Sequence, residues 1–309
     1  MRIAIIGGNG QVGSYLIPML VQKGHDVICV CRGTSKYVHE SAELSKIREV
    51  HLNRDEAGFE QKIAELGCDA VVDIICFSKT QAQKMVGALS GNVGHYVAVG
   101  SIWIHGPAAC VPVTEDEYRN PPDEYGRNKL QLTDYLMEQW QKNRFPATVV
   151  HPGHIIAPGH SAIVGPQGNR DMAVFLALSK GLKVVLPNFG LETLHHVHAK
   201  DVAGIIDAAI RVGEPTFGEE YHAVSPRAIT LRGFCEEVAA LYNRQARLRF
   251  MPYDDFARIV GAANAITTLE HIDRSPSCSP AKAERELGYT TTTTMDAVVE
   301  HLEALGLLP

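Results

Sequence analysis

The sequence predicts an α/β fold with a doubly wound parallel sheet and a smaller mixed C-terminal lobe. Three observations support this: a short apolar strand that runs into a glycine-rich turn and a helix, a regular alternation of strands and helices up to residue 151, and a broken order of helices after it. Strands that alternate with helices form crossover units, which build parallel sheets covered by helices. Ligands of such sheets bind at the carboxyl ends of the strands.

The first element is the apolar run 2–6, which is followed by Gly7, Gly10 and Gly13. Gly7 permits a tight turn, Gly10 lets the backbone approach a pyrophosphate, and Gly13 lets the next helix pack closely on the strand. We expect that helix to bend at Pro18, because proline removes a backbone hydrogen bond. The N-terminus of a helix offers N–H donors to an anion, so the turn predicts dinucleotide binding. The alternative is an ordinary glycine-rich loop.

The second strand is expected at 25–31, and its end bears on the choice of cofactor. Folds of this kind that prefer NAD place a carboxylate there, on the adenosine ribose. Here the position falls on Cys31, and Arg32, Ser35 and Lys36 follow it. A guanidinium can pair with a 2'-phosphate and no carboxylate repels one, so NADP(H) is favoured, while NAD(H) stays possible. Alternatively, Arg32 stacks on the adenine or faces solvent.

The same alternation continues along the chain. Further strands are expected at 50–52, 69–75, 96–100 and 147–151, and helices at 59–66, 80–89 and 126–141. We therefore expect a dinucleotide-binding domain over 1–151, to which the segment 195–224 returns, and a substrate-binding lobe over most of 152–309. The lobe opens with a long loop at 152–169. Its expected elements are a strand at 183–186 and helices at 172–178, 203–212, 231–242, 253–262, 281–287 and 295–305.

The helix expected at 126–141 is preceded by a tyrosine that pairs with a lysine. Tyr125 and Lys129 are four residues apart, so they project from one face of the helix. A phenol ionises near pH ~10, and a neighbouring ammonium lowers that pKa. The pair could therefore move a proton on or off a substrate oxygen, although the spacing is also common on surface helices. Ser101 stands at the carboxyl end of the strand 96–100, as a catalytic group or only a helix cap.

The composition disfavours several classes of function. The chain has 309 residues and a net charge of -6 without a block of like charge, so neither nucleic acid nor a membrane is expected as a partner. No segment approaches the ~18 apolar residues that span a bilayer, and the N-terminus runs straight into a strand. The cysteines form no C-x-x-C pair and lie mostly in apolar runs, which is typical of a reducing compartment. We expect a cytoplasmic protein.

A group of histidines invites a metal interpretation. Its members are His151, His154, His160, His195, His196 and His198. Their spacing matches no H-E-x-x-H or closed zinc pattern, and no cysteine accompanies them. We therefore expect no metal, and we interpret these imidazoles as hydrogen-bonding groups of the core or as substrate contacts.

Together, these motifs resemble those of a known family. The glycine turn, Ser101 after a buried strand, and Tyr125 with Lys129 at the start of the next long helix are similar to the extended short-chain dehydrogenase/reductase family, of the NAD-dependent epimerase/dehydratase type. Further segments that resemble this family lie at 149–153, 197–203, 217–225 and 279–289. The resemblance covers essentially the whole chain and implies a Rossmann fold.

The resemblance implies a catalytic triad of Ser101, Tyr125 and Lys129. Tyr125 would be the general acid/base at a carbinol or carbonyl oxygen, and Ser101 would hydrogen-bond the same oxygen. Lys129 would hold the nicotinamide ribose and depress the tyrosine pKa, so both residues also count as cofactor contacts. The other expected cofactor contacts are Gly7, Asn9, Gly10, Gln11, Val12, Gly13, Arg32, Ser35, Lys36, Ile75, His151 and Pro152.

Departures from the family pattern narrow the chemistry. Dehydratases of this family follow the hydroxyl residue at the strand end with an Asp-Glu pair, but no acid follows Ser101 within 102–106, so dehydration is disfavoured. The arginine with which nucleotide-sugar epimerases grip a pyrophosphate is missing before 197–203, which weakens diphosphate recognition. Trp103 and His105 could contact the substrate or merely anchor their loop. The expected substrate contacts are Trp103, His105, His154 and Arg274.

Three functions remain open. The first is an NAD(P)-dependent oxidoreductase or epimerase that transfers hydride at a secondary alcohol or ketone of a sugar-like small molecule. The second is an NADPH-dependent reductase of a less polar carbonyl compound, which Arg32 and the missing diphosphate grip would suit. The third is a non-catalytic nucleotide-binding relative, which the intact Ser101, Tyr125 and Lys129 disfavour. The resemblance also suggests a homodimer that pairs through the Tyr125 helix.

Overall fold

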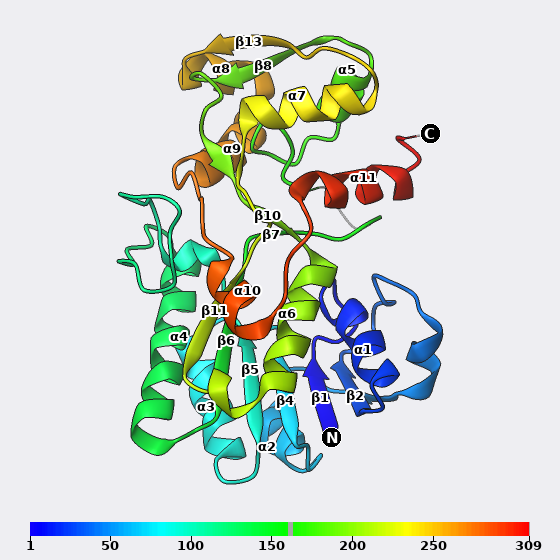
Figure 1. Cartoon of the computed structure of the whole chain (residues 1–309), viewed down its shortest axis with the longest axis vertical. Coiled ribbons are helices and arrows are strands. Elements are labelled where there is room, and N and C mark those ends of the chain that lie inside the picture. Colours follow the sequence, from blue (N-terminus) through cyan, green and yellow to red (C-terminus); the bar gives the residue numbers. More distant parts are fainter. Residues whose placement is uncertain (160–162, 309) are drawn as a thin grey trace.

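The computed structural model describes residues 1–159 and 163–308, and a seven-stranded sheet forms its centre (Figure 1). Every strand pair in this sheet is parallel, and the order is β11-β6-β5-β4-β1-β2-β3. The strands are β1 (Arg2–Ile6), β2 (Asp26–Cys31), β3 (Arg48–His51), β4 (Ala70–Asp73), β5 (His95–Val99), β6 (Ala147–Pro152) and β11 (Glu219–Ala223). The predicted doubly wound parallel sheet is thus confirmed.

The strand order reverses between β1 and β4. From β1 the chain first builds outward to β2 and β3, and then crosses to β4, β5 and β6 on the other side. Such a reversal leaves a crevice at the carboxyl ends of the two central strands, where ligands bind. Gly7 after β1 and Ile75 after β4 face each other there, and a Cβ on Gly7 would lie 2.9 Å from the Ile75 side chain. Any side chain at position 7 would therefore collide with Ile75, so glycine lets the two loops lie close together at the crevice.

Helices cover both faces of the sheet, which buries its central strands, whereas the edge strand β3 stays largely exposed. Along β1, Ile3 and Ile5 pack in one apolar cluster and Ala4 and Ile6 in another, so the strand reads as a continuous apolar run. One face carries α1 (Gly13–Gln22), α6 (Ala199–Val212) and α10 (Ala281–Leu287), and the other carries α2 (Phe59–Ala64), α3 (Lys79–Leu89) and α4 (Glu124–Asn143). The helix α1 runs through Pro18, and the bend expected there stays a prediction.

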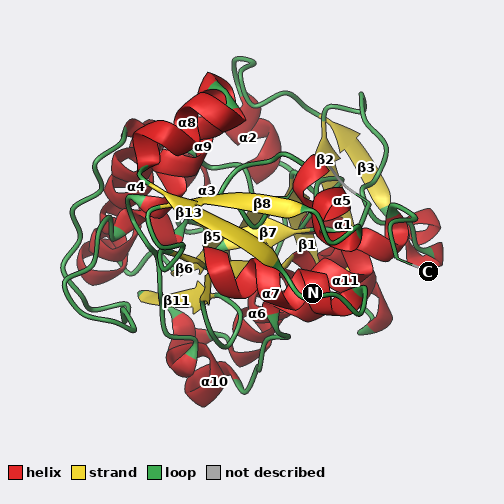
Figure 2. Cartoon of the chain, turned by 90° about the horizontal axis from the view of Figure 1, so that it is seen from above, coloured by secondary structure: helices red, strands yellow, loops and turns green. Residues whose placement is uncertain are grey.

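The C-terminal lobe lies beyond the carboxyl ends of the sheet strands (Figure 1), and Figure 2 looks down on it. Its core includes Phe175, Leu186 and Phe234. Its main elements are α5 (Ala173–Ser179), β8 (Lys183–Pro187), α7 (Leu231–Leu241), β13 (Arg247–Met251), α8 (Tyr253–Val260), α9 (Ala262–Ile272) and α11 (Thr294–Ala304). Short strand pairs join β7 (His154–Ile156) to β10 (His196–His198) and β9 (Thr193–Leu194) to β12 (Ile229–Thr230). The short 3-10 helices are η1 (Ala42–Lys46), η2 (Ile102–Ile104) and η3 (Glu214–Thr216).

The lobe contains elements that the sequence did not predict, among them the strands β9, β10, β12 and β13. Gly261 has a φ of 83° and ends α8, so the helix expected at 253–262 is followed directly by α9, which was not predicted. The expected loop at 152–169 contains β7, which pairs with β10 about 40 residues away. A three-residue strand shows too little periodicity to be recognised locally, because its partner alone defines it. None of the helices in the described ranges has the length and apolarity needed to cross a membrane.

Candidate active site

Helix α4 begins with a capped turn that carries Tyr125. The carboxylate of Asp123 accepts a hydrogen bond from the backbone N–H of Gly126 at 2.9 Å. This satisfies one of the donors that a helix start leaves free and fixes the first turn. Arg274 forms an ion pair with the other carboxylate oxygen of Asp123. The C-terminal lobe therefore holds the start of α4 in place.

Ser101 and Tyr125 meet at the wall of a cavity of about 610 Å³. Ser101 directly follows β5, Tyr125 belongs to the first turn of α4, and Trp103 lies on η2 between them. The rings of Trp103 and Tyr125 pack edge to face with centroids 5.8 Å apart. Among the predicted residues, those that line the cavity are Gln11, Ser101, Trp103, Tyr125, Pro152 and His154. The structure thus brings together the two expected catalytic oxygens and two of the four expected substrate contacts.

Tyr125 is 41% exposed, whereas Ser101 is 6% exposed. Burial and the charge of Asp123 raise the pKa of Tyr125, burial more strongly. The hydrogen bond with Ser101 lowers this pKa, but the net shift is upward. The hydroxyl oxygen of Ser101 also accepts a hydrogen bond from the backbone N–H of Trp103 at 3.2 Å. Tyr125 is therefore a protonated phenol at neutral pH, held beside a hydroxyl that is fixed by the backbone.

Lys129 lies one turn further along α4 and is only 1% exposed. Its ammonium donates hydrogen bonds to the backbone carbonyl oxygens of Cys76, at 2.7 Å, and Val99, at 2.6 Å. Its Nζ lies 5.9 Å from the ring centroid of Tyr125. Burial lowers the pKa of Lys129 to about 8. The lowering of the Tyr125 pKa expected from this lysine is absent in this arrangement, because the ammonium is turned to the two carbonyls.

His151 does not reach the cavity, contrary to its expected role as a cofactor contact. Its side chain is completely buried behind Ser101, where its Nδ1 accepts the backbone N–H of Ser101 at 3.1 Å. The Nε2 of His151 must then carry the proton, and it donates to the carboxylate of Glu220 at 2.9 Å. Arg119 pairs with the same carboxylate at 2.9 Å. The residue therefore anchors the backbone of Ser101.

Two predicted substrate contacts also lie outside the cavity. His105 is buried, and its Nε2 lies 2.9 Å from the Nε2 of His222. Arg274 is buried as well; its guanidinium carbon lies 3.9 Å from the ring centroid of Trp103, and its nitrogens bond Asp123 and a backbone carbonyl. Because both terminal nitrogens of its guanidinium bond protein groups, Arg274 braces the cavity wall and is not available to grip a diphosphate. His105 likewise anchors its loop, which was the alternative expectation.

Two further cavities flank the glycine turn. One of about 370 Å³ is lined by Gly7, Asn9, Gly10, Arg32 and Ile75, among others. The other, of about 490 Å³, is lined by Asn9, Gly10 and Arg32 together with Ser35 and Lys36. Half of the expected cofactor contacts therefore border these two cavities, which share Asn9, Gly10 and Arg32.

The last two residues of the glycine turn lie outside these cavities. Val12 packs its side chain in the apolar core, where it supports the turn from beneath, so its expected cofactor contact could come only from its backbone. A Cβ on Gly13 would lie 2.4 Å from the carbonyl oxygen of Gly8. Only glycine at position 13 thus permits the first turn of α1 to approach the backbone of Gly8 so closely. The glycine turn and the start of α1 together form a cradle that suits a dinucleotide pyrophosphate.

Several cavity residues escaped the sequence analysis. Thr267, Glu270 and His271 come from α9, which was not predicted, and Arg170 comes from the loop before α5. The rings of His271 and His154 lie 4.5 Å apart across the cavity wall. The run of apolar residues at helical spacing in 262–272 is the signal that could have revealed the helix. Its contribution to the cavity could not be seen, because it depends on how the lobe folds back.

The remaining histidines of the predicted group have structural partners, as expected. His195 accepts the backbone N–H of Cys278 and contacts the carbonyl of Ser225. His196 contacts the carbonyl of Val164, and His198 accepts the backbone N–H of Lys200. His160 lies outside the described residues.

Comparison with known proteins places this site in a family. Residues 3–222 match the model of the NAD dependent epimerase/dehydratase family. The 2'-dehydrokanamycin reductase of Streptomyces kanamyceticus is 28% identical over 239 residues, which are 77% of this chain and 66% of the reductase. The chain thus spans just under two thirds of that relative. A UDP-glucose 4-epimerase of Mycolicibacterium smegmatis is 23% identical over 71% of this chain and 75% of its own length.

Solved structures agree with these sequence matches at the level of the fold. UDP-N-acetylglucosamine 4-epimerase from Bacillus cereus superposes with a TM-score of 0.73 at 16% identity, over 100% of this chain and 98% of the other. UDP-glucose 4-epimerase from Thermotoga maritima, solved with UDP-glucose, gives 0.73 at 15% identity over 99% of both chains. With its parallel sheet, glycine cradle and matched motifs, the chain belongs to the NAD dependent epimerase/dehydratase family.

Proposed function

We propose that this protein is an NADP(H)-dependent oxidoreductase that reduces a ketone, or oxidises the corresponding secondary alcohol, in a sugar-like molecule. The observation that carries the proposal is the convergence of Ser101 and Tyr125 on one cavity that adjoins the glycine turn. A hydroxyl and a phenol at one wall can hold a single substrate oxygen. The glycine cradle at Gly13 fits a dinucleotide, because a side chain at that point would collide with backbone.

The chemistry divides between the cofactor and the chain. NADPH, when bound, supplies a hydride for the carbonyl carbon of the substrate. Tyr125 donates its proton to the carbonyl oxygen as negative charge develops there, and Ser101 donates a hydrogen bond to the same oxygen. The raised pKa of Tyr125 suits this direction, because the phenol is fully protonated at neutral pH. We propose that Lys129 contacts the cofactor ribose through the third N–H of its ammonium, because the other two bond the carbonyl oxygens of Cys76 and Val99.

The preference for NADP(H) rests on the cavity of about 490 Å³. Arg32, Ser35 and Lys36 line it, and no carboxylate does so among the described residues. A guanidinium, an ammonium and a hydroxyl form a site for the 2'-phosphate that distinguishes NADP(H) from NAD(H).

The substrate class follows from the polar groups of the larger cavity. His154, Thr267, Glu270, His271 and Arg170 line it, which suits a hydroxyl-rich molecule better than an apolar carbonyl compound. Burial keeps His271 neutral, because it lowers its pKa to about 4, so this imidazole can exchange hydrogen bonds with substrate hydroxyls without carrying charge.

A nucleotide sugar is less well matched. Arg274, the guanidinium that could have bound its diphosphate, is already paired with Asp123. The relative named 2'-dehydrokanamycin reductase supports the proposal that the substrate of this protein is a ketone that carries no nucleotide. Epimerisation of a UDP-sugar is the second candidate, and the UDP-glucose 4-epimerases among the relatives favour it.

The first experiment is to denature freshly purified protein and identify any released nucleotide by mass. An empty protein that binds NADPH tightly and consumes it with a keto-sugar would support net reduction. Stoichiometric NAD would instead mean that the cofactor is reduced and reoxidised within one turnover, and epimerisation would replace the proposal.

Catalysis by Tyr125 is tested by Tyr125→Phe. Loss of a general acid lowers the rate by about 10²–10⁴-fold, and we expect a fall of this size in kcat with little change in the dissociation constant of NADPH. Leu176→Ala, at an exposed apolar side chain of the lobe, serves as the control. A Tyr125→Phe variant that turns over like the wild type would refute the assigned role.

The choice of cofactor is tested by Arg32→Ala. Charge-assisted hydrogen bonds contribute about 1.5–3 kcal/mol, so the affinity for NADPH should fall by about 10–150-fold while that for NADH changes little. Arg48→Ala is the matched control, because Arg48 is an exposed arginine at the opposite end of the neighbouring strand. Equal losses for the two dinucleotides would show that Arg32 does not read the 2'-phosphate.

A further inference from the structure

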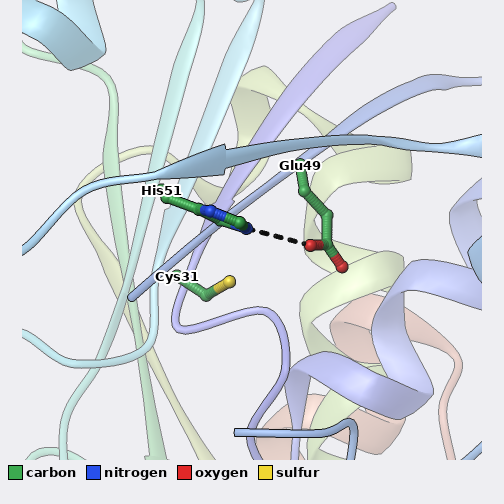
Figure 3. A group of neighbouring side chains, drawn as sticks. All are labelled: Cys31, Glu49 and His51. Carbon is green, nitrogen blue, oxygen red and sulfur yellow. Dashed lines mark hydrogen bonds and ion pairs between the residues drawn. The ribbon is translucent and has the colours of Figure 1, made fainter. Parts of the chain in front are cut away.

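Three side chains with different metal-binding atoms gather at the edge of the sheet, away from the proposed catalytic residues. Cys31 ends β2 and His51 ends β3, and the two residues are directly opposite each other in the parallel register. Glu49 lies two residues before His51, so its side chain emerges on the same face of the strand. Figure 3 shows the His51 ring and the Glu49 carboxylate facing each other, with the Cys31 sulfur beside them.

The geometry points to a binding site for a divalent transition-metal ion, and we propose Zn²⁺ as its occupant. One ligand atom from each of Cys31, Glu49 and His51 lies within 4.8 Å of the other two. Zn²⁺ binds thiolate, imidazole and carboxylate at about 2.0–2.3 Å, so a tetrahedral ion separates its donor atoms by roughly 3.3–3.8 Å. The Nε2 of His51 and the nearer oxygen of Glu49 are already 3.2 Å apart. Small side-chain rotations therefore suffice to close the site.

The surroundings are arranged as those of a ligand set. The hydroxyl of Tyr37 donates a hydrogen bond to the second carboxylate oxygen of Glu49, and such outer partners orient metal-ligating groups. Gly33 has a φ of 69°, and a Cβ there would lie 2.8 Å from the His51 ring. Any other residue at position 33 would therefore collide with the imidazole ring of His51 in its present position.

Access to the site is also suitable. Cys31 is buried, while the side chains of His51 and Glu49 are 60% and 40% exposed. An ion can therefore enter from solvent and meet the sulfur at the bottom of the site. Three protein ligands leave a fourth position for water, and the bound ion would cross-link the edge strand β3 to β2.

The test uses the whole protein carrying Cys110→Ser, because Cys110 is an exposed thiol that could bind metal by itself. After treatment with a chelator and its removal, the protein is titrated with ZnCl₂ by calorimetry and with CoCl₂ by absorption. We expect one ion per chain and, with Co²⁺, a thiolate charge-transfer band in the near ultraviolet. Loss of an outer partner alone costs about 10–100-fold in metal affinity, so Cys31→Ser and His51→Gln should each weaken binding by at least ten-fold.

His25→Gln is the matched control, because His25 is a histidine near the surface that belongs to no such cluster, and it should leave the affinity unchanged. Cys31→Ser should also abolish the thiolate band. If Cys31→Ser does not fold, His51→Gln and Glu49→Gln carry the test, because their side chains reach the solvent. Binding of less than one ion per chain would overturn the proposal. So would His51→Gln and Glu49→Gln variants that bind Zn²⁺ as tightly as their parent. Because Cys31 also lines the cavity of about 370 Å³ beside the glycine turn, all titrations use protein freed of nucleotide.

Discussion

Replacement of Lys129 by methionine separates the energetic cost of a buried ammonium from its use in function. Methionine fills much of the same volume but donates no hydrogen bond. In the wild type the ammonium is 1% exposed and bonds the carbonyl oxygens of Cys76 and Val99 at 2.7 and 2.6 Å. The substitution therefore removes two charge-assisted hydrogen bonds and one buried charge at the same time.

The two effects nearly cancel at neutral pH. Hydrogen bonds from a charged donor contribute about 1.5–3 kcal/mol each, so Lys129→Met loses about 3–6 kcal/mol. Burial lowers the pKa of Lys129 from 10.5 to about 8, which at about 1.36 kcal/mol per unit costs the wild type about 3.4 kcal/mol. The free energy of unfolding of the variant should thus be lower than that of the wild type by about 0–3 kcal/mol. We expect turnover to fall at least about 100-fold, because the cofactor ribose loses its proposed hydrogen-bond partner.

The dependence of stability on pH gives the sharper test. Because the folded pKa lies below the unfolded one, the native state binds fewer protons between pH 8 and 10.5, and the stability of the wild type rises with pH in this window. The cost is complete below about pH 8 and is relieved towards pH 10.5. Between pH 7.5 and 10 the wild type should gain roughly 2 kcal/mol relative to Lys129→Met.

The assay is urea unfolding of both proteins at pH 7.5 and pH 10. Other groups titrate in this range, but they are common to both proteins, so the difference between the two curves isolates Lys129. A stability difference that stays constant between the two pH values would refute the reasoning, since it would mean that the ammonium is not desolvated in the native state.

Two further predictions concern the support of the site. Glu220→Gln removes the charged acceptor of His151, so we expect a loss of about 1.5–3 kcal/mol, a fall in Tm of roughly 2–5 °C for a chain of this length, and a lower kcat from a looser Ser101. Burial alone would raise the pKa of Glu220, but the hydrogen bond from His151 and the charge of Arg119 lower it to about 2. The stability that the Glu220 carboxylate contributes is therefore present above about pH 4.5 and is lost as the pH falls towards 2. In thermal unfolding at pH 7 and pH 3, the Tm difference between wild type and variant should shrink in acid, and an unchanged difference would contradict this assignment. Gly13→Ala places a methyl group 2.4 Å from a backbone oxygen, so it should cost about 1–3 kcal/mol and weaken dinucleotide binding measured by fluorescence titration. Gly87→Ala in α3, where a Cβ meets no atom within 4 Å, should leave binding unchanged.

Much of the fold could be predicted because its signals are local. The strand 2–6, the glycine turn and α1 follow one another in the chain, and apolar periodicity with glycine spacing identifies them without knowledge of distant partners. The position of Tyr125 and Lys129 on one helix also follows from spacing alone. Their orientation does not, because the ammonium of Lys129 bonds carbonyls that lie 53 and 30 residues away.

The sequence by itself determined the sheet, the glycine cradle and the family, whereas tertiary structure decided which polar side chains face the cavity. His151 and Arg274 both look like ligand-binding residues in the sequence. Folding pairs His151 with Glu220, 69 residues away, and Arg274 with Asp123, 151 residues away. A buried imidazole or guanidinium must satisfy its hydrogen bonds wherever the chain provides a partner. The packing of the lobe on the sheet determines which residue becomes that partner. The local periodicity of the sequence contains no information about this packing.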